Sequence, residues 1–78
     1  MKDNIYKSRD LAESAILLIN NQHLIRFEKI GKIYWFYFEN AEKCSEISNQ
    51  YFFGELLVNA REFYQTINRL KNRIFAGT

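Results

Sequence analysis

The densest hydrophobic pattern along the chain lies at residues 23–39, where two apolar runs flank Gly31. Both runs are rich in the β-branched and aromatic residues that favour strands, and a glycine between them is typical of a hairpin turn. The first run alternates with charged residues and places Ile25 and Phe27 on one face, whereas residues 33–38 are apolar at every position. A strand with one solvated face would alternate with polar residues. The pattern therefore predicts a β-hairpin whose second strand is covered on both faces.

Apolar residues at helical spacing lie on both sides of this hairpin. Ser8 predicts the N-cap of a first helix, and the asparagines at residues 20–21 predict its end. Asn40 predicts the N-cap of a second helix, and Asn59, with a glutamate three residues later, resembles the capping box of a third. The apolar stripe of the first helix leaves Leu17 outside and comprises Leu11, Ala12, Ala15, Ile16, Leu18 and Ile19.

Two short segments predict further strands, one at residues 4–7 and one at residues 55–58. The resulting order matches the ferredoxin-like β-α-β-β-α-β arrangement, in which two helices cover one sheet face. The last helix would then cover the opposite face, over Ile33, Trp35 and Tyr37. We therefore predict a small α+β sandwich in which three helices pack a β-hairpin. The absence of proline and of any linker predicts a single domain spanning all 78 residues.

Composition agrees with a small globular domain, since 47% of the residues are hydrophobic and 17% are aromatic. The net charge of +2 is too small to predict a nucleic-acid partner by itself. A single cysteine favours a reducing compartment, and no apolar run suits a signal peptide or a membrane span. We expect a cytoplasmic protein of a prokaryote or a virus, without membrane association. The predicted core consists of Leu18, Ile25, Phe27, Phe36, Phe38, Ile47, Phe63, Ile67 and Leu70.

Candidate catalytic and metal-ligating residues are few. Cys44 lies on the apolar stripe of its predicted helix, which favours a buried small hydrophobe, and His23 is expected at the surface. Nothing in the spacing of these two residues favours a nucleophile with its base. The three glycines are far apart and match no phosphate-binding loop, and one histidine with one cysteine forms no metal motif. The sequence predicts no enzyme, no cofactor, and no catalytic or metal-binding residues.

The polar face of the predicted last helix is the first candidate binding surface. It carries Arg61, Arg69, Lys71 and Arg73, and Glu62 is the one acidic residue on that helix. Basic side chains on one helix face can contact nucleic-acid phosphates. The alternative is an ordinary solvated helix face.

The aromatic residues of the second hairpin strand are the other candidate. Trp35 and Tyr37, with Arg26 and Lys32 nearby, resemble a sheet platform on which single-stranded bases stack. The alternative is that the last helix covers these side chains, or that a second copy of the chain contacts them together with Ile33.

Several short motifs resemble those of a small prokaryotic and phage domain family of unknown function. They are VNAREF at residues 58–63, RLK at 69–71, IF at 74–75, SRDL at 8–11, FxFE at 36–39 (x being any residue) and Tyr51 before a glycine. The chain departs from the family at residues 20–21, where two asparagines replace the expected glycine. The resemblance implies the order helix, β-hairpin, helix and C-terminal helix, and it implies no activity and no site residues.

Together these patterns predict a non-enzymatic binding module, an accessory protein of a phage or mobile element. Its expected partner is nucleic acid, engaged through the basic face of the C-terminal helix. The alternative is a homodimeric protein-interaction module or an inhibitor of a larger host protein.

Overall fold

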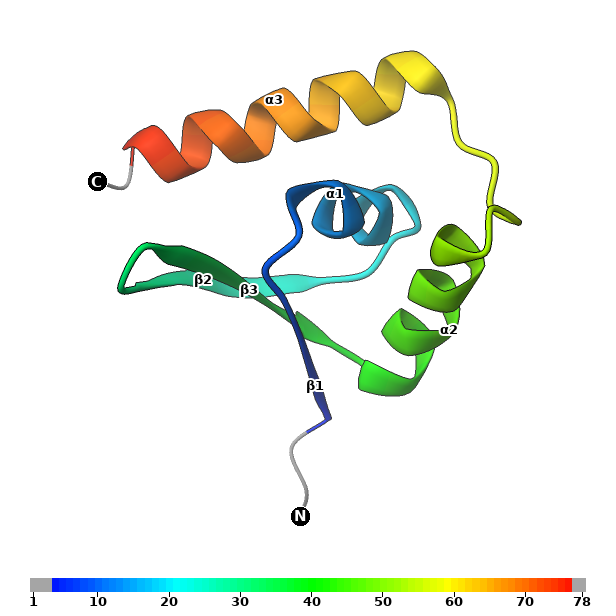
Figure 1. The fold of residues 1–78 in the computed structure, drawn as a ribbon, viewed down its shortest axis with the longest axis horizontal. Coiled ribbons are helices and arrows are strands. Elements are labelled where there is room, and N and C mark those ends of the chain that lie inside the picture. The colour runs from blue at the N-terminus through cyan, green and yellow to red at the C-terminus, as the bar shows by residue number, and fades with distance from the viewer. Residues whose placement is uncertain (1–3, 77–78) are drawn as a thin grey trace.

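The computed structural model describes residues 4–76, which form an α+β fold as predicted (Figure 1). Its elements are β1 (Ile5–Ser8), α1 (Leu11–Ile19), β2 (Leu24–Ile30), β3 (Ile33–Glu39), α2 (Ala41–Phe52) and α3 (Ala60–Ala76). The strands make one antiparallel sheet in the order β1-β3-β2, so β3 pairs with both neighbours. Within residues 4–76, no helix combines the length and the apolar character needed to cross a membrane.

The predicted hairpin forms, with Gly31 at its turn in a left-handed conformation (φ 65°) that carries no penalty for glycine. A β-bulge between Leu24 and Arg26 interrupts the alternation of β2 by one residue. As a consequence Leu24, and not Ile25, joins Phe27 against the core, and Ile25 is 38% exposed. The prediction that Ile25 is a core residue is therefore wrong.

Helix ends follow the predicted capping residues with one exception. The side chains of Asn40 and Asn59 each accept a backbone N–H from three residues further on, at 3.2 and 2.9 Å. Asn21 follows α1 in the left-handed conformation (φ 67°) that ends many helices. Ser8 does not cap α1, because it is still part of β1; Asp10 takes this role and accepts a backbone N–H at 3.1 Å.

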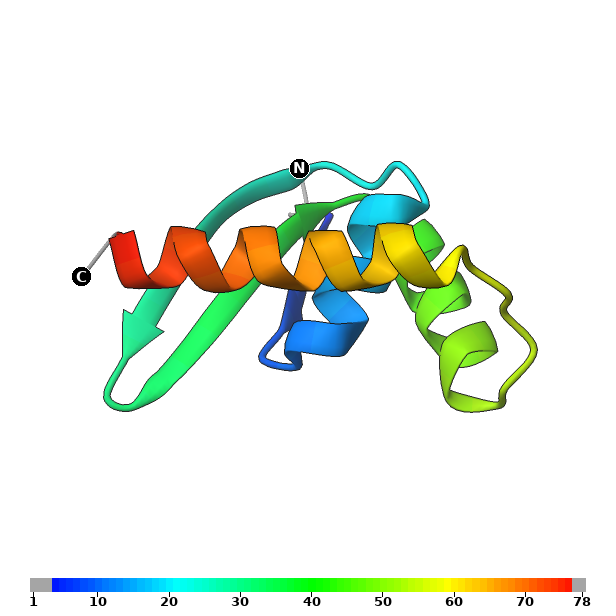
Figure 2. The same cartoon turned by 90° about the horizontal axis from the view of Figure 1, so that it is seen from above.

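Helix α1 lies at the centre of the molecule, between the sheet and α3, with α2 beside it (Figures 1 and 2). A helix with neighbours on several sides buries more than one stripe. Leu17, which the sequence placed outside the stripe, is therefore completely buried. Apart from Ile25, every predicted core residue belongs to the core or packs against it. The buried cluster consists of Ala15, Ile16, Leu17, Phe36, Phe38, Cys44, Ile47 and Leu70.

The predicted strand at residues 55–58 does not form. This segment runs from the end of α2 to the start of α3, away from β1, so no free strand edge lies beside it (Figure 1). The segment still alternates between buried and exposed side chains, because Leu56 and Val58 pack against the core while Leu57 is exposed. The sheet therefore keeps the split β-α-β order of the ferredoxin-like arrangement without its last strand.

Helix α3 does not cover the face predicted for it. Its apolar stripe packs on α1, and its later half extends over the hairpin on the same side of the sheet as α1 (Figure 2). The reason is that α1 offers apolar side chains on the side away from the sheet. No helix within residues 4–76 therefore lies over Ile33, Trp35 and Tyr37.

Candidate nucleic-acid interface

The sheet has one face turned away from α1, α2 and α3. Alternate residues of β3 point into the core, so the residues between them point to the opposite face. On that face β1 places Lys7 opposite Tyr37, and β2 places Arg26 opposite the same residue. Glu28 lies opposite Trp35. We call this surface the outer face and define it as the side chains of Ile5, Lys7, Arg9, Arg26, Glu28, Ile30, Ile33, Trp35, Tyr37 and Glu39.

Tyr37 is held in place by its polar neighbours on the outer face. The Arg26 guanidinium carbon lies 4.1 Å from the centroid of its ring, and the Lys7 Nζ lies at 5.7 Å. The Tyr37 hydroxyl donates a 2.7 Å hydrogen bond to Glu28, which raises the pKa of Tyr37. These neighbours leave the residue only 6% exposed. Tyr37 therefore orders the cations around it and is not free to stack on a base.

Trp35 is the more open aromatic residue of the outer face, with a half-buried side chain. The guanidinium carbon of Arg9 lies 6.0 Å from its ring centroid. The face thus joins three exposed cations, Lys7, Arg9 and Arg26, to two aromatic rings. One of its two carboxylates is engaged by the Tyr37 hydroxyl, and the other lies at the end of β3.

The sequence identified part of this constellation. It placed Trp35 and Tyr37 on one face near Arg26, as the structure does. It missed Lys7 and Arg9, which reach the aromatic residues only through the pairing of β1 with β3. The period-two alternation of β1 would have placed Lys7 on an outward face, but it could not identify the neighbouring strand.

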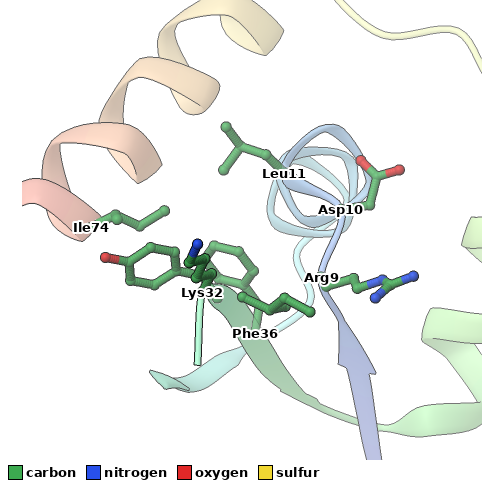
Figure 3. Close-up of a pocket in the computed structure, with 8 residues that line it drawn as sticks. Arg9, Asp10, Leu11, Lys32, Phe36 and Ile74 are labelled. Carbon is green, nitrogen blue, oxygen red and sulfur yellow. The ribbon is translucent and has the colours of Figure 1, made fainter. Parts of the chain in front are cut away.

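Lys32 lines a groove and is not at the centre of the outer face (Figure 3). The groove has a volume of about 620 Å³ and lies between α1, the hairpin turn and the end of α3. Leu11, Phe36 and Ile74 contribute to its apolar lining. The Arg9 side chain points away from Leu11 and Ile74 in this view, in keeping with its position over the Trp35 ring.

The basic residues of α3 are all exposed, but they do not form one patch. At about 100° per residue, Arg69 and Arg73 share one side of the helix, while Lys71 lies far around it and Arg61 lies between. Arg69 and Arg73 line a second groove together with Glu62 and apolar side chains of α1 and β2. This site holds two cations next to a carboxylate, so its positive potential is weaker than the sequence suggested.

A second polar cluster lies inside the fold. The buried carboxylate of Glu13 accepts hydrogen bonds from the hydroxyls of Tyr6 at 2.6 Å, of Ser8 at 2.5 Å, and of Ser48. The cluster therefore connects β1, α1 and α2. Sequence reasoning missed it, because its members come from three elements that meet only in the folded chain. Ser8 and Ser48 are also buried, so this group stabilises the fold and offers no path for a substrate.

The other candidate chemical groups lie where the sequence predicted. Cys44 is completely buried, and burial, followed by the charge of Glu13, raises the pKa of its thiol, which disfavours the reactive thiolate. His23 is exposed. Among the residues that the structure describes, no three histidine, cysteine or acidic side chains come close enough to hold a metal ion.

Alkaline pH is expected to destabilise the fold through Tyr6. Burial, with the hydrogen bond to Glu13, raises the pKa of Tyr6 above its usual 10.0, so the folded state keeps a proton that the unfolded state releases. This stabilising contribution is complete below pH 10 and is lost as the pH rises through the folded pKa. Urea unfolding at several pH values between 8 and 11 should show the decline. The free energy of unfolding of the Tyr6→Phe variant should decline less steeply with pH. An equal decline in the variant and the parent protein would contradict this role of Tyr6.

Comparison with known proteins confirms the family resemblance and adds no function. A family model described as a domain of unknown function (DUF5659) matches residues 3–76. No match was found among curated proteins or among solved structures.

Proposed function

This chain belongs to the DUF5659 family, a domain of unknown function, and we propose that it is a non-enzymatic module that binds single-stranded nucleic acid on its outer face. One observation carries the proposal. Three cations from β1, the residue that follows it and β2 surround the aromatic residues of β3, on a face that no helix within residues 4–76 covers.

The cations of the outer face suit the phosphates of a nucleic acid. Arg26 and Lys7 lie against the Tyr37 ring, and Arg9 lies over Trp35, so each side chain has already lost part of its freedom before a ligand binds. A guanidinium group can donate two parallel hydrogen bonds to one phosphate. Binding a phosphate would therefore cost these side chains less conformational entropy than it would cost freely moving lysines.

A single strand fits this face better than a duplex does. The face is a sheet surface, and it presents no helix that could enter a major groove. The bases of a single strand are free to stack, and Trp35 offers a partly exposed ring beside the cations. Such contacts recognise any base, so we expect little sequence preference.

The proposal places the protein among binding modules and not among enzymes. The internal cluster around Glu13 is closed to substrates, and the Cys44 thiol is buried. A buried thiol without a disulfide partner suits a reducing compartment, so a cytoplasmic location is part of the same proposal.

Substituting glutamine for Lys7, Arg9 and Arg26 together should abolish binding to fluorescent single-stranded oligonucleotides, measured by anisotropy at several salt concentrations. If some binding remains, the slope of log affinity against log salt should flatten by about two units, since each single-strand phosphate contact contributes about 0.7. Trp35→Ala should weaken binding by about 1–3 kcal/mol without changing the slope, because it removes a stacking contact and no charge.

The matched control is the triple glutamine variant of Arg61, Arg69 and Arg73 on α3. It removes the same number of positive charges, and it should bind nearly as well as the parent protein. A larger loss of affinity in the α3 variant than in the variant of Lys7, Arg9 and Arg26 would assign the interface to that helix. Absence of binding by the parent protein at low salt would exclude the function. Circular dichroism of each variant checks that the fold is intact.

A further inference from the structure

The last residue of α2 and the connection from α2 to α3 expose three bulky apolar side chains. Phe52 is 63% exposed, Phe53 is 76% exposed and Leu57 is 94% exposed. Singly scattered apolar residues are normal on protein surfaces, whereas a large exposed apolar patch is characteristic of an interaction surface. These three large side chains lie within six positions of the chain. The connection from α2 to α3 lies at the end of the molecule opposite the hairpin turn (Figures 1 and 2). We call these three side chains the connection patch.

The backbone holds the connection patch outward. Gly54 adopts the left-handed conformation (φ 72°), and the N–H of Glu55 returns to a carbonyl in the last turn of α2 at 2.9 Å. Further along, Leu56 and Val58 pack against the core, which turns Leu57 between them toward solvent. A patch fixed in this way loses little conformational entropy when it binds.

We propose that a second copy of this chain binds the connection patch, in a dimer with two-fold symmetry. A large apolar side chain carries about 150–250 Å² of surface, so the patch exposes roughly 400 Å² per copy. Two patches packed on each other bury roughly 800 Å², so polar residues at the rim must supply roughly 400 Å² more for the dimer to reach the lower limit of about 1,200 Å² for specific interfaces.

The charges around the patch favour a second copy over an unrelated partner. Glu55 and Arg61 are both exposed and have opposite charges, and they lie before and after Leu57 in the sequence. Neither takes part in an ion pair within the described residues. In a two-fold interface every contact occurs twice, once in each direction. The proposed dimer pairs Glu55 of one copy with Arg61 of the other, so both pairs form at once.

This dimer leaves the outer face of both copies uncovered. The interface considered from the sequence, formed by Ile33, Trp35 and Tyr37, would instead bury that face. Two open faces in one dimer can bind one long strand together, which raises the apparent affinity without any new contact.

Sedimentation velocity of the full chain, without nucleic acid, tests the dimer over about 1 µM to 1 mM protein. The parent protein should shift from monomer to dimer, and Leu57→Asp should remain monomeric throughout. Because Leu57 is exposed, this substitution leaves the core intact, which circular dichroism verifies. The matched control is Ile30→Asp, which places the same charge on another exposed apolar residue, next to the hairpin turn. It should dimerise like the parent protein.

Charge reversal tests the two-fold arrangement. Glu55→Arg and Arg61→Glu should each weaken the dimer, because like charges then meet at the rim, and the double variant should restore it. A parent protein that stays monomeric at 1 mM would overturn the proposal, as would a dimer that survives Leu57→Asp. Dissociation by Ile30→Asp would assign the interface to the hairpin, and a double variant without recovery would exclude the two-fold pairing. None of these outcomes depends on nucleic-acid binding.

Discussion

Phe36→Ala is expected to lower the free energy of unfolding by about 3–5 kcal/mol. Phe36 lies on the central strand β3 and is almost completely buried. Its ring packs against Phe27, with 6.2 Å between the ring centroids, and it belongs to the same core cluster as the buried residues of α1 and α3. Truncation removes buried apolar area and leaves a cavity that a small core cannot fill without moving its strands. Urea denaturation followed by circular dichroism measures the change.

The expected loss is a large part of what a small domain possesses, because domains are typically stable by only about 5–15 kcal/mol. Ile30→Ala provides the control, since Ile30 lies in the same hairpin but is more than half exposed. It should change stability by no more than about 0.5 kcal/mol. Equal effects of the two substitutions would contradict the burial of Phe36. If Phe36→Ala does not fold, Phe36→Leu should still lose measurably more stability than Ile30→Ala.

Features that depend on neighbours in the sequence were predictable. The turn at Gly31 and the helix caps at Asn40 and Asn59 use contacts within three residues, so their chemistry can be read directly from the chain. The hairpin strands are predictable for the same reason, because alternation and aromatic content are local properties.

Features that depend on distant contacts were not predictable. Ile25 is the extra residue of the bulge in β2, which interrupts the period-two alternation and leaves Leu24, and not Ile25, in line with Phe27. Leu17 is buried because α1 has neighbours on several sides, an arrangement that no pattern within α1 can reveal. The stripe of α3 predicted that one helix face would be buried, but it contained no information on which surface it would meet.

The candidate site also contains a part that could be predicted from the sequence and a part that could not. Trp35 and Tyr37 were recognised as a shared face from their spacing, since both lie on β3. The cations Lys7 and Arg9 come from the N-terminal part of the chain, and their position beside these rings depends on the register between β1 and β3. The sequence thus supplied the aromatic half of the outer face, and the sheet topology supplied most of its charge.

Glu13→Ala is expected to lower the free energy of unfolding by about 3–5 kcal/mol, as much as the loss of a large core side chain. The Glu13 carboxylate is the shared acceptor for the hydroxyls of Tyr6, Ser8 and Ser48. Ser48 lies 35 residues away in sequence, so the cluster links α2 to α1 and β1. Removing the acceptor leaves two serine hydroxyls buried without this partner, and each unsatisfied group costs about 1–3 kcal/mol.

Further variants separate this cluster from an ordinary effect of an acidic residue at a helix start. Glu42 occupies the first turn of α2 and is exposed, so Glu42→Ala should lose only the interaction with the helix dipole, about 0.3–1 kcal/mol. If Glu13 acted only as an acid in the first turn of α1, Glu13→Ala would cost the same as Glu42→Ala, and the cluster would have no stabilising role. Glu13→Gln keeps the shape of the side chain and one acceptor oxygen but loses the charge. Its loss of stability should therefore lie between those of Glu42→Ala and Glu13→Ala. Combining Glu13→Gln with Ser48→Ala should cost less than the sum of the two single changes, because both act on the same hydrogen bond.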